Sequence, residues 1–575
     1  MEKEIKKLIK IALKDLDIDV GEIILEHPED LKNGDYSTNV AMAAAKRIEK
    51  NPKDLAEKIV AEINLTQNPL LKGEGGIEKI EAKNGFINFH LSRKFFAGSI
   101  EEIVNQGENV GKNKILSGKK IMVEYTQPNP FKPFHIGHLM SNSIGESISR
   151  LVEFSGAKIA RANYQGDVGL HIAKAIYGLL KDKNLQNDML SVSAQASNIG
   201  KAYVLGAGIY EEDENAKKEI DEINKKIYGR SDENINKIYD WGFKITMEAF
   251  EELYKILGTK FDFYFLESAM MDIGREIVEA NRGKIFEESN GAVVFHAEKY
   301  DHKLHTRVFI TTQGLPTYET KELGLTEEKF KTNPEMDLSI VVTASEQMEY
   351  MRVVAKAISL IHPEYEKKML HITHGMMRFA SGKMGSRKGN VITGESLLDD
   401  ARSAILEKIK DRDVPMNEKE SISSDVGVAA IKYSILKQSI GGDIIYDFEK
   451  SISMEGDSGP YLQYSYARAN SILEKAKTEN ILPDFDVVPD EIFEVEKLLY
   501  KFGEVVGRAA AEYEPHYVVN YLIEIARSFN SFYGNTMVVN KEDKTSSYKV
   551  ALTYAFSFVM KTGLHLLGIR APKKM

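Results

Sequence analysis

The chain has 575 residues, of which 43% are hydrophobic and 28% are charged, and its formal net charge is −10. This composition is typical of a soluble globular protein with about three or four domains, and the acidic balance excludes a generally basic nucleic-acid coat. Cysteine is absent, which excludes a disulfide scaffold and zinc sites built on thiolates. We therefore expect no structural zinc, and no residue of the chain is predicted to be a metal ligand.

The amino-terminal residues predict an amphipathic helix that belongs to a folded domain. Ile5, Leu8, Ile9 and Leu13 recur at helical spacing with lysines on the other face. The segment lacks the long apolar stretch of a signal peptide, and no run of 18 apolar residues occurs in the chain. We expect a cytoplasmic protein that makes no contact with membranes.

A parallel sheet is predicted after about residue 116. Residues 121–125 indicate a short strand, 136–154 a helix ended by a Ser-Gly pair, and 158–164 a second strand. Strand, helix and strand within about 45 residues form a βαβ unit, and such units build parallel sheets. Further strands are expected at 308–312, 338–343 and 370–374.

The rest of the chain divides into parts of different character. Residues 1–115 mix helices with strand-like runs such as 85–89, which predicts an α+β domain. The α/β domain spans 116–415, and its charged, helical segment at about 172–265 is predicted to be an insertion. Strand signals fade after about residue 415, so 416–575 is predicted to be an all-α bundle.

The string H-I-G-H at residues 135–138 lies where a strand-end loop becomes a helix. Ligands of parallel α/β sheets bind at the carboxyl ends of the strands, and helix N-termini attract phosphate. His135 and His138 can donate hydrogen bonds to phosphate oxygens, and Gly137 lets a flat ligand approach the backbone. The alternative is that these histidines cap the helix or pack against it.

A second string, K-M-G-S-R-K-G-N, occupies residues 383–390. It carries three cations, Lys383, Arg387 and Lys388, among glycines. A mobile cationic loop of this kind suits closure on pyrophosphate as it leaves. The alternative is a solvated basic turn.

Taken together, the two strings resemble the two signatures of class I aminoacyl-tRNA synthetases. Other strings narrow the resemblance to the arginyl-tRNA synthetases and extend it over nearly the whole chain: N-x-x-G-D-x-G at 163–169, D-S-G-P-Y-L-Q-Y-S-Y-A-R at 457–468 and the end 567–575. The resemblance implies a Rossmann-like catalytic domain, an appended N-terminal domain that contacts tRNA and a C-terminal anticodon-binding bundle.

The resemblance also implies the residues of the nucleotide site. The catalytic groups would be Lys132, His135, His138, Lys383, Arg387 and Lys388, and the ATP site would comprise Pro128, His135, Gly137, His138, Lys383 and Met384. The family pattern in the second string is K-M-S-K-S, from which this chain departs at Gly385 and Ser386. Lys132 is the candidate replacement for the missing second lysine.

An arginine pocket needs acceptors for a planar fork of five donors, preferably carboxylates in bidentate geometry. By resemblance, the pocket residues are Glu124, Asn129, Tyr318, Glu322 and Gln347. The family usually has Y-x-T-R-D where this chain has Y-E-T-K-E at 318–322, so a longer acid stands at Glu322. The alternative for each acid alone is a surface ion pair.

On the tRNA side, the resemblance and an interleaving of aromatic and basic residues indicate base stacking in the C-terminal bundle. The predicted tRNA-binding residues are Tyr461, Gln463, Tyr464, Arg468, Tyr533 and Met575. The alternative is that aromatic residues on helices belong to the core.

The predicted reaction is attachment of L-arginine to its tRNA by way of arginyl-adenylate, with ATP and Mg²⁺, by a monomer. Arginine attacks the α-phosphate, pyrophosphate leaves, and the terminal ribose of tRNA then takes the arginyl group. One rival function is a small-molecule nucleotidylyltransferase, which would need neither the string at 457–468 nor a long helical tail. Another is a non-catalytic tRNA-binding relative.

Overall fold

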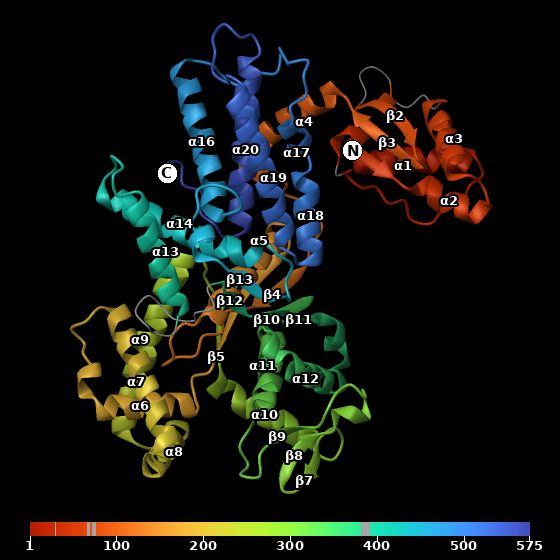
Figure 1. Cartoon of the computed structure of the whole chain (residues 1–575). Coiled ribbons are helices and arrows are strands. Elements are labelled where there is room, and N and C mark those ends of the chain that lie inside the picture. Colours follow the sequence, from red (N-terminus) through yellow and green to blue (C-terminus); the bar gives the residue numbers. More distant parts are fainter. Residues whose placement is uncertain (29, 66–68, 72–75, 381–391) are drawn as a thin grey trace. The chain divides into compact units, whose positions relative to one another are not determined.

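The computed structural model describes residues 1–575 except 29, 66–68, 72–75 and 381–391 (Figure 1). The described residues form two compact units. The first unit comprises Met1–Val110, Arg468–Gly503 and Glu524–Met560. The second comprises Gly111–Ala467, Glu504–Ile523 and Lys561–Met575.

The first unit contains the predicted α+β domain. An antiparallel sheet in the order β1-β3-β2 packs with helices over one apolar core. The amino-terminal helix buries Ile5, Leu8 and Ile9 as its spacing predicts. The elements are α1 (Glu2–Asp15), β1 (Tyr36–Thr38), α2 (Val40–Ile48), α3 (Pro52–Leu65), β2 (Ile77–Lys83), β3 (Phe86–Leu91) and α4 (Arg93–Gln106).

Helical segments from late in the chain also belong to the first unit. Helix α17 (Glu494–Leu499) packs against α4. Arg93 of α4 donates a hydrogen bond to Oε2 of Glu496 at 2.7 Å, and Glu496 is fully buried. This paired charge fastens α4 to α17. Parts of four further late helices also belong to this unit: α16 (Gly459–Thr478), α18 (Phe502–Glu512), α19 (His516–Asn535) and α20 (Ser546–Leu566).

The second unit is organised by a five-stranded parallel sheet in the order β11-β10-β4-β5-β6. Its strands are β4 (Lys120–Glu124), β5 (Lys158–Gln165), β6 (Phe263–Leu266), β10 (Leu338–Ala344) and β11 (Met369–His374). Helix α5 (Ile136–Phe154) connects β4 to β5, so the predicted βαβ unit and the α/β fold class are confirmed. Because all five strands are parallel, their carboxyl ends meet along one edge of the sheet.

Two groups of elements interrupt the sheet. The first is a set of helices with its own core, drawn in yellow in Figure 1, which matches the predicted helical insertion. The second combines three helices with a small antiparallel sheet, drawn in green. The helices of the first group are α6 (Leu170–Lys181), α7 (Val192–Glu212), α8 (Glu214–Gly229) and α9 (Glu233–Leu257). The second group consists of α10 (Glu267–Ala280), β7 (Glu287–Ser289), β8 (Ala292–Phe295), β9 (Arg307–Ile310), α11 (Tyr318–Thr332) and α12 (Met348–Ile361).

Glycines bring the backbones of α10 and α11 close together. A Cβ atom at Gly274 would lie 1.9 Å from the carbonyl oxygen of Thr320, and one at Gly324 would lie 2.1 Å from that of Met270. Larger side chains would force the helices apart. The close approach lets side chains of one helix reach those of the other near the sheet edge.

Two strand predictions need amendment. The strand expected at 308–312 is β9, which pairs antiparallel with β8 in the small sheet and not with the parallel sheet. Beyond residue 415 the chain is mainly helical, yet β13 (Ile444–Tyr446) pairs with β12 (Met377–Phe379). A three-residue strand carries too little periodicity to predict. The helices between β12 and α16 are α13 (Gly394–Lys408), α14 (Met416–Leu436) and α15 (Phe448–Ser451).

A buried group of charges, here called the anchor cluster, ties α5 to other parts of the second unit. It consists of Glu146, Arg150, Arg161 and Lys432. Nε of Arg150 lies 2.7 Å from Oε1 of Glu146.

The other donors of the anchor cluster end on backbone carbonyls. Nζ of Lys432 donates to the carbonyls of Leu257 at 2.7 Å and Gly568 at 2.9 Å. Arg150 donates to those of Gly258 at 2.6 Å and His565 at 2.8 Å. Burial lowers the pKa of Lys432 to about 7.

None of the helices in the described part of the chain is long and apolar enough to cross a bilayer.

Candidate active site

The loop after β4 holds three non-glycine residues in left-handed backbone conformations. The φ angles are 79° at Thr126, 53° at Gln127 and 65° at Phe131. Such angles are costly, above all for the β-branched threonine, and they persist only where the surroundings impose them. Here Asn142 donates to Oγ1 of Thr126 at 3.0 Å, and Phe131 is fully buried in the core of the insertion. Strain of this kind clusters at functional sites.

His135 and His138 lie together at the amino end of α5. Their rings stack with centroids 3.5 Å apart, and the backbone N–H of His135 donates to Nδ1 of His138 at 3.2 Å. Burial and the nearby charges of His135 and Lys132 lower the pKa of His138 well below its usual value. The ring is therefore neutral and carries its proton on Nε2, where it can serve as a donor.

Lys132 lies close to these histidines. Burial and the charge of Lys174 lower the pKa of Lys132, and the charge of Glu267 opposes the effect. Its Nζ lies 5.5 Å from the ring centroid of Tyr203 on α7, within cation–π range. A cation, two imidazoles and a helix N-terminus thus converge at this edge, an arrangement suited to phosphate.

The remaining predicted nucleotide residues are Pro128, Gly137 and those of the second string. Pro128 is buried, and its carbonyl accepts a hydrogen bond from Gln165 at 3.2 Å. A Cβ atom at Gly137 would lie 3.2 Å from the ring of His135, so this position has little room for a side chain. The predicted residues of the second string lie outside the described residues: Lys383, Met384, Arg387 and Lys388.

Beside the nucleotide loop lies a second group of charges, here called the pocket cluster, in which every member is buried except the half-buried Glu322. It consists of Glu124, Glu267, Lys321, Glu322 and Lys329. Glu124 contacts Nζ of Lys329, and Glu267 lies 2.7 Å from Nζ of Lys321. In each of these pairs both side chains are nearly inaccessible to water.

Glu322 has no ammonium of its own in this cluster. It forms a hydrogen bond with Tyr350 of α12 and feels the charges of Glu124, Lys329 and Glu267. Burial and the charge of Glu124 raise the pKa of Glu322 to about 8. Burial likewise raises the pKa of Tyr350 and Tyr164, which face the same carboxylates. The pocket cluster therefore offers acceptors to a cation.

The remaining predicted arginine residues lie on different elements. Asn129 accepts a hydrogen bond from the backbone N–H of Gly166 at 3.0 Å. Tyr318 begins α11 and is 68% exposed, and Nζ of Lys321 lies 5.1 Å from the centroid of its ring. Gln347 ends a short 3₁₀ helix directly after β10 and is half-buried. Tyr318 and Glu322 both belong to α11, and residues four apart on a helix lie on one face.

The predicted tRNA residues belong to both units. Tyr461, Gln463, Tyr464 and Met575 lie in the second unit, and Arg468 and Tyr533 lie in the first. Gln463 is fully buried, and its amide donates to the backbone carbonyls of Asp425 and Arg570. The guanidinium of Arg468 lies 5.3 Å from the ring centroid of Tyr533, which is 44% exposed. Their contacts with tRNA stay predictions.

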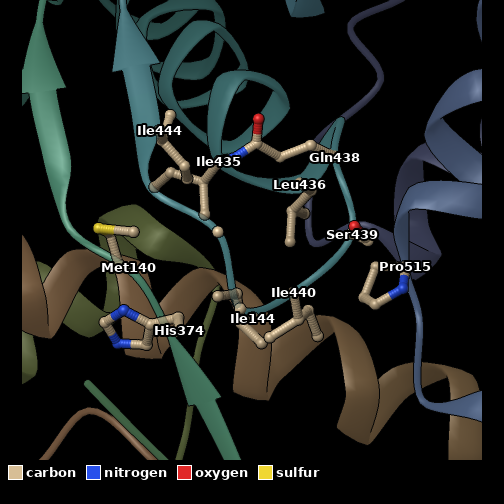
Figure 2. Close-up of a pocket in the computed structure, with 12 residues that line it drawn as sticks. Met140, Ile144, His374, Ile435, Leu436, Gln438, Ser439, Ile440, Ile444 and Pro515 are labelled. Carbon is tan, nitrogen blue, oxygen red and sulfur yellow. The ribbon is translucent and has the colours of Figure 1, made fainter. Parts of the chain in front are cut away.

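A cavity lies between α5, β11, α14 and the loop that follows α14. Figure 2 shows its mostly apolar lining, with Met140, Ile144 and Ile435. Its volume is about 10 Å³, which is the space of about one water molecule. It cannot hold an amino acid or a nucleotide.

Three residues of the pocket cluster were not among the predicted site residues: Glu267, Lys321 and Lys329. Lys329 lies seven residues after Glu322, and two helical turns place them on one face of α11. That spacing was a usable signal. Glu267 follows the short strand β6 directly, and the rule that ligands meet strand ends could also have found it.

Comparisons with known proteins cover the whole chain. Residues 3–91 match the arginyl-tRNA synthetase N-terminal domain, 99–448 the catalytic domain of class I tRNA synthetases (R), and 462–575 the DALR anticodon-binding domain. The arginine–tRNA ligase of Clostridium perfringens is 32% identical over 99% of this chain and 100% of the relative. That of Clostridium botulinum is 31% identical over 100% and 99%.

Solved structures share the fold. The arginyl-tRNA synthetase of Thermus thermophilus has a TM-score of 0.80 at 24% identity and covers 100% of both chains. That of Plasmodium falciparum has a TM-score of 0.76 at 21% identity and covers 100% of this chain and 99% of its own.

Proposed function

Because the chain belongs to the arginyl-tRNA synthetase family, we propose that it attaches L-arginine to tRNA in two steps. The carboxylate of arginine attacks the α-phosphate of ATP, which enters with Mg²⁺ as part of the substrate. Arginyl-adenylate forms and pyrophosphate leaves. The terminal ribose of tRNA then attacks the adenylate, and AMP is released. The protein supplies position and charge, and no side chain acts as a nucleophile.

The observation that carries this proposal is the pocket cluster beside the phosphate-binding edge. Glu124 ends β4, and the strained loop leads from it directly to His135 and the start of α5. A guanidinium held by Glu124 and Glu322 would place the rest of arginine at the same sheet edge as the histidines. Buried acceptors of this kind reject ligands that leave them unpaired.

At the nucleotide end, each group has a role. The neutral ring of His138 donates from Nε2 to a phosphate oxygen, and His135 stacks against it and limits its movement. Lys132 takes over the task of the missing second lysine and stabilises the charge that develops at the α-phosphate. Lys383, Met384, Arg387 and Lys388 complete the ATP site.

We propose that tRNA is the partner of the C-terminal helices and the N-terminal domain. The match of residues 462–575 to an anticodon-binding domain supports the first part. Tyr533 with Arg468 is the best-placed pair for stacking a base, because the ring is partly exposed and lies beside a cation. The domain boundaries at 115 and 415, the monomeric state and the cytoplasmic location stay predictions.

Charging of tRNA with each amino acid in turn tests the proposed function. The expected result is attachment of arginine alone, dependent on ATP. Glu322→Gln should raise the KM for arginine strongly and leave the KM for ATP nearly unchanged. Tyr533→Ala should raise the KM for tRNA, because the loss of one stacked base weakens binding by about 1–3 kcal/mol. Adenylylation of a small molecule without tRNA charging would support a nucleotidylyltransferase, and tRNA binding without ATP turnover would support a non-catalytic relative.

A further inference from the structure

We propose that binding of arginine expels one proton from the pocket cluster. In the free enzyme Glu322 carries a proton, and the incoming guanidinium takes its place while the proton passes to solvent. Lys329 and Lys321 act as positioning residues that pair with the other two carboxylates. This inference deepens the proposed function and rests on it.

The charge count of the cluster is the first step. Three carboxylates, Glu124, Glu267 and Glu322, face two ammonium groups. Each ammonium contacts a different carboxylate, so within the part of the chain that the structure describes one acid is left without an ion pair of its own. A carboxylate with little access to water in that position stays neutral or finds a cation. In the free enzyme a proton fills this role, and in the complex the ligand fills it.

Geometry identifies Glu322 as the acid that carries the proton. Glu124 contacts Lys329, and Glu267 contacts Lys321, whereas the hydrogen bond that Glu322 makes is with the neutral hydroxyl of Tyr350. Burial and the charge of Glu124 raise the pKa of Glu322 to about 8. The protonated form therefore predominates near neutrality.

The elements around Glu322 contribute groups of both signs. Among the described residues, the titratable and charged groups that face it or its partners include Glu124 of β4, Tyr164 of β5, Glu267 of α10, Lys321 and Lys329 of α11, Tyr350 of α12 and His371 of β11. Glu319 of α11 also acts on Tyr350, and its charge is matched by Arg307 at 3.3 Å. Burial lowers the pKa of His371 to about 4, so this ring adds no charge. Asp167 and Lys132 act on Glu267 with opposite signs. The surplus of one carboxylate thus persists when the surroundings are included.

Lys329 shapes what the pocket accepts. Its ammonium contacts Oε2 of Glu124, and Gln127 donates to Oε1 at 2.7 Å, so a ligand must share that carboxylate and reach Glu322 as well. A planar guanidinium presents donors in several directions and can bridge two carboxylates. A ligand ammonium is a compact point charge, and it would lie close to that of Lys329. The built-in lysine therefore favours arginine over lysine.

Calorimetry of arginine binding to the full chain, in two buffers of different ionisation enthalpy, measures the proton directly. With a pKa of about 8, binding at pH 7 should release about 0.9 proton, and Kd should fall about tenfold from pH 6 to pH 7. Glu322→Gln should bind arginine more weakly, with no proton release beyond that from the α-amino group of the ligand. Glu328→Gln is the matched control on the same helix: it is partly exposed, pairs with Lys331 and should release protons like the native chain.

Two outcomes separate the inference from the proposed function. Arginine binding without proton release, or with equal release from Glu322→Gln, overturns the inference and leaves the function standing. Failure of arginine to bind at all overturns the proposed function.

Lys329 has its own test. Lys329→Met should raise the pH at which arginine affinity changes, because one less cation faces Glu322, and Lys329→Arg should restore the native profile. A purely structural lysine would change affinity equally at every pH, which would contradict its assigned role. If Lys329→Met does not fold, the pH profile of Lys329→Arg decides: a native-like profile supports the role, and a profile without pH dependence overturns it.

Discussion

The pocket cluster and the anchor cluster are both buried in the second unit, and their charges are unbalanced in opposite directions. The anchor cluster has more cations than acids, yet the surplus donors of Lys432 and Arg150 end on backbone carbonyls. The surplus acid of the pocket cluster, Glu322, has a tyrosine hydroxyl and, in the described part of the chain, no ion pair of its own. Surplus donors that are satisfied within the fold rigidify it, whereas an unmatched acid leaves a task for a ligand.

Loss of a cation from the pocket cluster should have the largest effect on stability. Lys329→Met leaves Glu124 buried without its partner, and breaking a buried ion pair costs about 3–5 kcal/mol. Urea unfolding at pH 8 measures the loss. Lys331→Met on the same helix is the control, because that side chain is largely exposed and should change stability by less than about 0.5 kcal/mol. A loss from Lys329→Met no larger than that of the control would contradict the pairing.

Lys132 lies near the pocket cluster but is not one of its paired ammoniums, so its removal should separate catalysis from stability. Lys132→Ala should raise the barrier to adenylate formation by about 2–4 kcal/mol, the range for loss of one preorganised donor. Single-turnover formation of adenylate measures this barrier. Lys201→Ala on the insertion is the control and should be silent. An unaltered rate would remove Lys132 from the mechanism.

Removal of the anchor lysine should destabilise the fold by an amount comparable to removal of the pocket lysine. Lys432→Met leaves two buried carbonyls without donors, at about 1–3 kcal/mol each before relaxation.

The pH dependence of the anchor cluster has a definite sign. Because burial lowers the pKa of Lys432 to about 7 from an unfolded value of 10.5, the unfolded chain binds more protons between these values and stability rises with pH there. The Lys432→Met variant should not show this rise of stability with pH. Equal slopes in the unfolding free energies of the two proteins would refute the assignment.

The effect of Glu322→Gln on stability should depend on pH. Because the folded pKa of Glu322 is raised to about 8 from 4.5, the native fold binds more protons than the unfolded chain between these values, and the native chain loses stability as pH rises from about 4.5 to about 8. Glutamine does not titrate, so the variant should gain on the native chain across this window and be the more stable of the two above pH 8. Thermal unfolding without arginine, repeated across this pH range, measures the stability of both proteins. Parallel plots of stability against pH for the two proteins would contradict a protonated Glu322.

The sequence predicts the helices and strands that carry the site better than it predicts the ion pairs within the site. The helix expected at 136–154 is α5 with the same bounds, because its apolar periodicity and the Ser-Gly pair after Phe154 are local signals. The strands that lead to Glu124 and Gln165 are also predicted within a residue or two.

The ion pairs of the pocket cluster could not be predicted from the sequence. The contact of Glu124 with Lys329 joins a strand to a helix far along the chain, and it depends on how α11 packs against the sheet. The pairing of β9 with β8, and that of β13 with β12, likewise arise from tertiary contacts that short segments do not encode.

Arginine and citrulline have nearly the same shape, and only arginine carries the positive charge that the pocket cluster lacks. Their affinities for the full chain, compared by calorimetry at pH 7.5, test most directly whether the unmatched acid is a guanidinium site. Since a buried charge left without a partner is heavily penalised, citrulline should bind at least about a hundredfold more weakly than arginine. Equal affinities would mean that the surplus carboxylate is not what recognises the ligand.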